Sequence, residues 1–96
     1  MSRTLENANK ERGILQMIRD YLRLRGWFVV RMQQGLGCHR GLSDLIAVKQ
    51  GRVLFVEVKA PKGQQSTYQV EFQREIEEHG GVYVLAKSIE DLEGIA

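Results

Sequence analysis

Apolar and polar residues alternate in short blocks along this chain, and each block predicts one element of a mixed α/β domain. From Glu11 to Arg25, apolar residues recur every three or four positions, which predicts an amphipathic helix. Gly26 suits the left-handed position that ends such a helix. Residues 1–10 are polar, so they either extend this helix or are frayed before it.

Three stretches rich in β-branched and aromatic residues follow, and they predict strands at 27–32, 44–49 and 52–59. The segment 33–43 contains three glycines and no periodicity, so we expect a loop there. The dipeptide at 50–51 (Gln-Gly) separates the second strand from the third, which suits a two-residue hairpin.

A second helix is predicted at 66–79. Ser66 and Gln69 fit the S-x-x-Q capping box at its start. Its apolar stripe is spaced at four-residue intervals and consists of Tyr68, Phe72 and Ile76.

The chain ends with a predicted strand and a short helix. Residues 82–86 (VYVLA) read as the strand, and Ser88 is placed to cap a helix carrying Ile89 and Leu92. The predicted order is α-β-β-β-α-β-α, a mixed central sheet flanked by helices. The last two strands, joined through a helix, are expected to be parallel.

Composition indicates one globular domain, with 96 residues of which 43% are hydrophobic and 27% charged. The net charge of +2 is too small to indicate a nucleic-acid partner by itself. Its distribution is more informative, because residues 12–40 contain six arginines and a single acidic residue, Asp20. A basic half suits a polyanion, although a solvated helix face explains the same charges.

Cys38 is the only cysteine, which excludes a disulfide framework and a cysteine-based zinc site. No apolar run approaches the roughly 20 residues of a membrane span, and the N-terminus lacks the apolar core of a signal peptide. We therefore expect an intracellular, cytoplasmic protein with no membrane partner.

Two carboxylates are expected to face each other across the predicted hairpin. With residues 50–51 as the turn, Asp44 lies opposite Glu57, and opposed residues project from one face with Cβ atoms about 5 Å apart. Like charges placed this way destabilise a sheet unless a cation lies between them. Mg²⁺ takes one or two carboxylates together with waters and substrate phosphate. The backbone carbonyl of Val58 could add a ligand.

Lys59 lies on the Glu57 face, two residues further along the strand. An ammonium there can lower the pKa of an attacking water or stabilise charge on a scissile phosphate. Asp44, Glu57 and Lys59 thus equip one hairpin for metal-assisted phosphodiester hydrolysis. For Glu57 and Lys59 alone, an ion pair at a strand end is an adequate explanation, and Asp44 in register favours the catalytic one.

Gln69 has two explanations. It lies on the stripe that faces the sheet, where it could hydrogen-bond to Lys59, to a nucleic-acid phosphate or to the attacking water. The capping box also accounts for it, and we expect the two roles to exclude each other in one conformation.

Glu11 lies on the inward stripe of the first helix, from which it could reach the metal site. A first-turn glutamate that complements the helix dipole is an equally good explanation. Glu6 takes its place if the helix starts earlier. His39 could protonate a leaving group, although a lone loop histidine is usually only solvated.

The chain resembles the PD-(D/E)XK nuclease superfamily, and specifically its VRR-NUC family, over about Glu11 to Leu92. The resemblance is carried by G-x-x-D (41–44), E-V-K (57–59), Q-x-x-F (69–72) and G-G-V-Y-V (80–84). It implies a restriction-endonuclease-like core. Ser43 stands where the superfamily signature has a proline, a departure that the superfamily tolerates.

Carried over by position, the resemblance implies a catalytic centre made of Asp44, Glu57, Lys59, Gln69 and Glu11. It implies Mg²⁺ or Mn²⁺ held by Asp44, Glu57, the Val58 carbonyl and Glu11, the last directly or through water. No small-molecule cofactor is implied. The resemblance also favours the site role for Gln69 over the cap.

Small stand-alone members of the family are similar to Holliday-junction resolvases, which act as homodimers on four-way DNA junctions. Cutting a two-fold symmetric junction on two strands calls for two sites related by a dyad, which agrees with this. We therefore expect residues 1–96 to form one nuclease domain, of phage or bacterial origin, that cuts branched DNA as a homodimer in repair or recombination. The alternatives are a flap or non-specific DNA nuclease, and a non-catalytic DNA-binding module.

Contacts to the DNA backbone need cations but no base readout. The candidates are Arg12, Arg19, Arg23, Arg31, Arg40 and Lys62.

Overall fold

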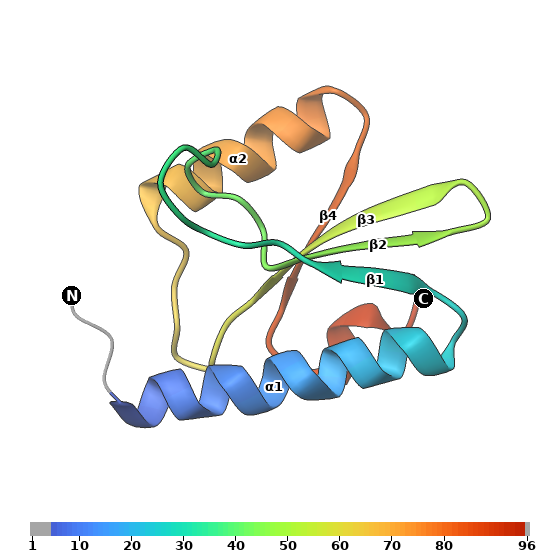
Figure 1. The fold of residues 1–96 in the computed structure, drawn as a ribbon, viewed down its shortest axis with the longest axis horizontal. Helices are drawn as coiled ribbons and strands as arrows, with labels where there is room; N and C mark the ends of the chain where they lie inside the picture. Colours follow the sequence, from blue (N-terminus) through green and yellow to red (C-terminus); the bar gives the residue numbers. More distant parts are fainter. Residues whose placement is uncertain (1–4, 96) are drawn as a thin grey trace.

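A four-stranded sheet in the order β1-β2-β3-β4 lies between two helices, α1 on one face and α2 on the other (Figure 1). The computed structural model describes residues 5–95. Its elements are α1 (Leu5–Leu24), β1 (Phe28–Arg31), β2 (Leu45–Lys49), β3 (Arg52–Val58), α2 (Thr67–Glu78), β4 (Val82–Ala86) and η1 (Ile89–Leu92). The predicted α/β class and element order are confirmed. The last helix is a 3₁₀ turn, with Asp91 accepting a hydrogen bond from the Ser88 N–H.

The first helix begins earlier than Glu11, at Leu5, so residues 5–10 extend it. Residues 1–4, which belong to the segment expected to be either frayed or helical, lie outside the described residues. Gly26 ends the helix as predicted, with φ at 91° and the following Trp27 N–H donating to the Leu22 carbonyl.

The hairpin between β2 and β3 has the predicted two-residue turn, with positive φ at Gln50 (49°) and Gly51 (78°). Its register runs from Lys49 opposite Arg52 to Leu45 opposite Val56, as the spacing predicts. β1 pairs antiparallel with β2, and β3 pairs parallel with β4. This register directs the next pair of residues, Asp44 and Glu57, toward each other.

Alternation along β3 separates the two faces of the sheet. Leu54, Val56 and Val58 belong to the main core, which α1 and η1 cover. Phe55, on the opposite face, packs edge-on against Phe72 of α2 with ring centroids 5.9 Å apart. Glu57 therefore shares its face with α2, and the main core holds the other side of its strand in place.

The capping box of α2 is present as predicted, but its apolar stripe is shorter than expected. Phe72 is buried, whereas Tyr68 is exposed and its hydroxyl accepts a hydrogen bond from Arg40 at 2.6 Å. Tyr68, in the first turn of this helix, therefore contacts the loop that precedes β2 instead of the sheet.

Candidate active site

Asp44 lies directly before β2 and is held by the backbone on both sides. Its carbonyl accepts from the Met32 N–H at 2.8 Å, which continues the pairing with β1. Its Oδ2 accepts from the Val58 N–H at 2.7 Å, across the hairpin. The second contact fixes the carboxylate against the end of β3, beside the Val58 carbonyl that is the predicted third ligand.

Glu57 is almost completely buried, with 2% of its surface exposed. One carboxylate oxygen, Oε2, accepts from Gln69 Nε2 at 2.8 Å and lies 3.5 Å from Lys59 Nζ. The other oxygen, Oε1, is buried and has no hydrogen-bond partner within residues 5–95. A buried, ionised carboxylate oxygen without a donor is costly, so this atom is a position suited to a proton or a cation.

Burial, and to a lesser extent the neighbouring Asp44, raise the pKa of Glu57 to about 8 against the opposing effect of Lys59. Burial also raises the pKa of Asp44, while the hydrogen bond from Val58 and the interaction with Glu57 act to lower it. Because both carboxyls are desolvated and lie close together, losing both protons is costly for the pair. The two groups face each other as predicted, and the single lysine does not compensate for their desolvation.

The two roles expected to exclude each other at Gln69 are both present, so that expectation was wrong. Its Oε1 accepts from the Ser66 N–H at 2.8 Å, and its own N–H donates to Ser66 Oγ at 3.1 Å, which completes the capping box. Its Nε2 donates to Glu57 at the same time. An amide side chain has an acceptor end and a donor end, and the helix start uses only the acceptor.

A cavity of about 140 Å³ opens beside Asp44, between the first half of α1 and the ends of the strands. Glu11 lines it together with Arg12, Arg31 and Val58. Glu11 also raises the pKa of Asp44, although less than burial does. Glu6 instead pairs with Lys10 at 3.2 Å and does not line the cavity.

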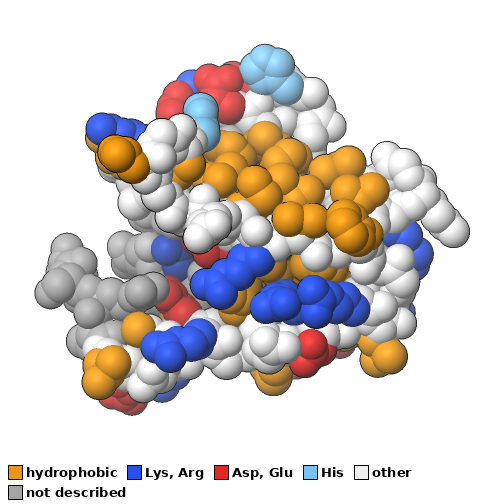
Figure 2. All heavy atoms as spheres, in the orientation of Figure 1, with side chains coloured by type: hydrophobic (Ala, Val, Ile, Leu, Met, Phe, Trp, Pro, Cys, Tyr) orange, Lys and Arg blue, Asp and Glu red, His pale blue; other side chains and the backbone are white. Residues whose placement is uncertain are grey.

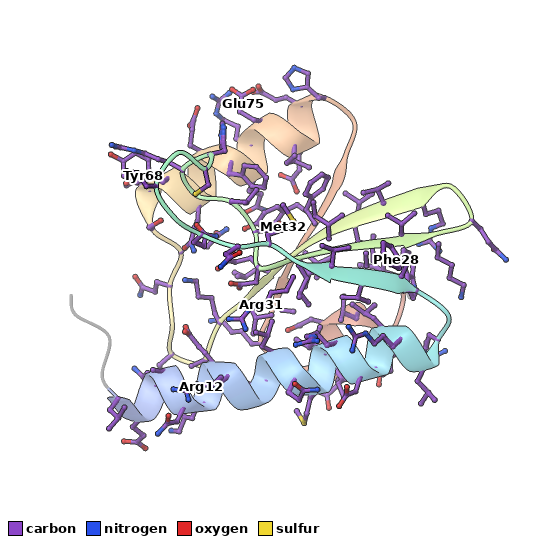
Figure 3. The ribbon with its side chains drawn as sticks, viewed as in Figure 1. Arg12, Phe28, Arg31, Met32, Tyr68 and Glu75 are labelled. Atoms are coloured by element: carbon purple, nitrogen blue, oxygen red, sulfur yellow. The ribbon has the colours of Figure 1, made fainter. Side chains whose placement is uncertain are left out.

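Of the six predicted DNA-contacting residues, the structure brings Arg12 and Arg31 to this cavity, from α1 and β1 (Figure 3). Arg40 lies elsewhere, stacked on the Tyr68 ring with its guanidinium 4.9 Å from the centroid. The remaining candidates do not line the cavity, and they are Arg19, Arg23 and Lys62. His39 packs against Phe72, with ring centroids 5.6 Å apart.

Sequence reasoning gave Gly41 no role, yet this residue positions Gln69. Its φ is 77°, and a Cβ built on it would overlap the Tyr68 carbonyl and the Gln69 backbone nitrogen. The absent side chain lets the loop lie against the first turn of α2. Ser43, in the place of the signature proline, is fully buried and donates to the Leu45 carbonyl at 3.2 Å.

The donor set fits a hard divalent cation that is only partly enclosed by protein. Within residues 5–95, no group of three or more His, Cys, Asp or Glu side chains is arranged to hold a metal ion. Asp44 and Glu57 offer two carboxylates, one of them with an oxygen that lacks a donor. Mg²⁺ is usually held in this way, because water and substrate phosphate complete its octahedron.

Comparison with known proteins agrees with this geometry. The family model of the archaeal Holliday junction resolvase (Hjc) matches residues 6–87. The chain belongs to the Hjc family. A solved structure described as a VRR_NUC domain is also similar, with a TM-score of 0.76 and 17% identity over 90% of this chain and 92% of that one. No curated protein matches the chain.

The predicted VRR-NUC resemblance and restriction-endonuclease-like fold are thus confirmed. Membership of the Hjc family supports a nuclease that acts on DNA. Within residues 5–95, no helix is long and apolar enough to cross a membrane.

Proposed function

We propose that this Hjc-family protein is a Mg²⁺- or Mn²⁺-dependent endodeoxyribonuclease that cuts branched DNA, in particular four-way junctions, as a homodimer. The observation that carries the proposal is the buried Glu57 carboxylate beside Asp44 and Lys59, with one oxygen lacking a donor. A structural ion pair would have needed neither the second carboxylate nor the unsatisfied oxygen.

Each residue then has a separate role. Asp44, Glu57 and the Val58 carbonyl would hold the metal, with Glu11 as a further ligand directly or through water. When bound, the metal lowers the pKa of a water and polarises the phosphate. Lys59 would orient or deprotonate the attacking water and offset negative charge on the phosphate in the transition state.

Gln69 acts on Glu57 and not on Lys59. By binding Oε2, its amide leaves Oε1 as the oxygen free to take a ligand, and it fixes the carboxylate plane. Gln69 is therefore a positioning residue, and the capping box holds it in turn.

The substrate backbone is expected to cross the cavity between α1 and β1. Arg12 and Arg31 flank the carboxylates there and suit the phosphates on either side of the cut. A protomer carries one such site, whereas a junction is resolved by two cuts related by a dyad, which supports the homodimer.

The test is cleavage of a labelled synthetic four-way junction in Mg²⁺ or Mn²⁺, beside flap and plain duplex substrates. We expect paired cuts in the junction, and no cuts in EDTA or with Lys59→Ala. Cutting that persists in either condition would contradict the mechanism. Equal cutting of all substrates would favour a non-specific nuclease, and junction binding without cutting would favour a binding module.

A further inference from the structure

The sheet face that α2 covers only in part presents six apolar side chains on three adjacent strands. We call this surface the apolar sheet face, and its members are Phe28, Val30, Ile46, Val48, Val53 and Phe55. The strand register places them in two cross-strand rows. The first row joins Phe28, Val48 and Val53, and the second joins Val30, Ile46 and Phe55.

This face is open to solvent where α2 ends. Phe28 is 69% exposed, Val53 41%, Val30 40% and Val48 37%. In the space-filling view the continuous orange area below α2 lies over these strands (Figure 2), and Phe28 is labelled on β1 (Figure 3). The four residues expose on the order of 300 Å² of apolar surface, within the size range that in a monomer often marks a functional patch.

The chemistry of the face argues against DNA as its occupant. None of its six members is charged, whereas the phosphate backbone is bound through Lys and Arg. The cations that suit DNA, Arg12 and Arg31, line the cavity on the α1 side instead.

Neutrality also suits association around a two-fold axis, where each surface meets its own copy. The outer side of α2 carries Glu71, Glu75, Glu77 and Glu78 against Arg74, so two copies of that surface would repel. Two copies of the apolar sheet face can pack together without placing like charges opposite each other.

We propose that the apolar sheet face is the surface through which two copies of this chain associate. The inference rests on the proposed function for the homodimer and adds the surface that forms it. A standard interface buries about 800 Å² on each partner, with an apolar centre and a polar rim. The exposed rows supply such a centre, and the surrounding polar surface supplies the rim.

The position of the face relative to the active site is suited to two cuts in one substrate. Val53 and Glu57 share a face of β3 and are four residues apart, about 13 Å along the strand. Sheets packed face to face are about 10 Å apart, so a dyad through the face places the two sites within roughly 30 Å of each other. One DNA junction can reach both.

The test is sedimentation equilibrium of three chains. Val53→Asp introduces a charge into the first row of the face, on β3, and Val82→Asp is the matched control. Val82 is similarly exposed (45%) but begins β4 in register with Leu54, on the α1 side of the sheet. Phe28→Glu, at the most exposed member, serves as a second test variant if Val53→Asp fails to fold by circular dichroism.

We expect the wild type and Val82→Asp to sediment at about 22 kDa, twice the 11.0 kDa of one chain. The face variants should sediment as monomers, with a dimer dissociation constant raised at least tenfold. A wild type that stays monomeric at high concentration, or face variants that associate like the wild type, would overturn the proposal. So would face variants that remain dimers but lose DNA binding, because the face would then contact DNA.

Metal-dependent cutting of the labelled four-way junction by the same chains separates this inference from the proposed function. Monomeric face variants that nick single strands but no longer make paired cuts support both. A wild-type dimer that depends on the face but cuts no DNA supports the interface and overturns the nuclease. A wild type that is monomeric but cuts DNA supports the nuclease and overturns the interface.

Discussion

The Gln69 side chain joins the first turn of α2 to Glu57 by donating from Nε2 to Glu57 Oε2 at 2.8 Å while its Oε1 caps the helix. The start of a helix and the orientation of a buried carboxylate therefore depend on one amide. This contact predicts that the two functions can be separated by mutation.

Ser66→Ala should lower the free energy of unfolding by about 1 kcal/mol and leave cleavage close to normal, because it removes only the capping hydroxyl. Gln69→Glu should keep the cap, since Glu also serves in a capping box. It loses the donor to Glu57 and adds a third negative charge, so cleavage should fall at least tenfold. Chemical denaturation and junction cleavage measure both effects. Equal activity of the two variants would argue against a positioning role for Gln69.

The raised pKa of Glu57 predicts that stability without metal falls with pH. Below about 4.5, Glu57 is protonated in both the folded and the unfolded chain. Between about 4.5 and 8 only the unfolded chain loses the proton, so its stabilising contribution disappears as pH rises through this range. The limiting slope is a loss of about 1.4 kcal/mol per pH unit. Urea unfolding in EDTA at several pH values measures it.

Glu57→Gln should flatten this profile, because the amide does not titrate. Added Mg²⁺ should oppose the decline in the wild type, since the metal binds the ionised carboxylate. An unchanged profile in Glu57→Gln would show that another group causes the decline.

Asp44→Asn should stabilise the metal-free protein and abolish its stabilisation by Mg²⁺. The variant keeps an acceptor for the Val58 N–H and removes one of two desolvated charges. A gain of about 1 kcal/mol corresponds to a rise in Tm of roughly 4–8 °C for a domain of this size. Thermal denaturation with and without Mg²⁺ measures both effects. Asp20→Asn, at an exposed position on α1, is the control and should change neither.

Gly41→Ala should be far more disruptive than Gly37→Ala, although both glycines have positive φ, 77° and 88°. A methyl group at Gly37 meets nothing within 4 Å, so only the backbone strain of about 1–2 kcal/mol applies. At Gly41 the methyl group overlaps the start of α2, so stability and cleavage should fall together. Denaturation and cleavage of both variants provide the comparison, and equal losses would show that the close approach to α2 is unimportant.

Arg31→Ala should weaken DNA binding uniformly across sequences and reduce the salt dependence of the affinity by about one counterion. Its side chain lines the cavity beside Asp44. Arg74→Ala is the control, because that guanidinium is engaged by Glu71 and Glu78 on α2. Binding titrations at several salt concentrations measure the slope. Equal slopes for the two variants would indicate that the DNA backbone does not cross the cavity.

The sequence predicted most of the fold because its elements are defined by local chemistry. Gln-Gly at 50–51 determined the hairpin, and from it followed the register that directs Asp44 toward Glu57. The capping box located the start of α2 for the same reason, since its partners are three residues apart.

The contacts that the sequence did not predict join residues that are far apart along the chain. The Asp44 bond to the Val58 N–H, the Arg40 contact with Tyr68 and the packing of Gly41 against α2 all depend on how the loop before β2 lies on the helix. The hydrogen bond from Gln69 to Glu57 was not predicted for another reason. Its capping role was treated as using the whole side chain, although it uses only the oxygen.

The loop that precedes β2 is packed against the protein near Gly41 and Ser43 and is exposed to solvent at its tip. Gly41 and Ser43 are packed against α2 and β2, whereas Gly35 and Gly37 have free space around them and Leu36 between them is fully exposed. Residues inserted near Leu36 would project into solvent without moving Asp44. The length and composition of this tip can therefore change while Asp44 keeps its position, so the surroundings of the candidate site can vary without altering the site itself.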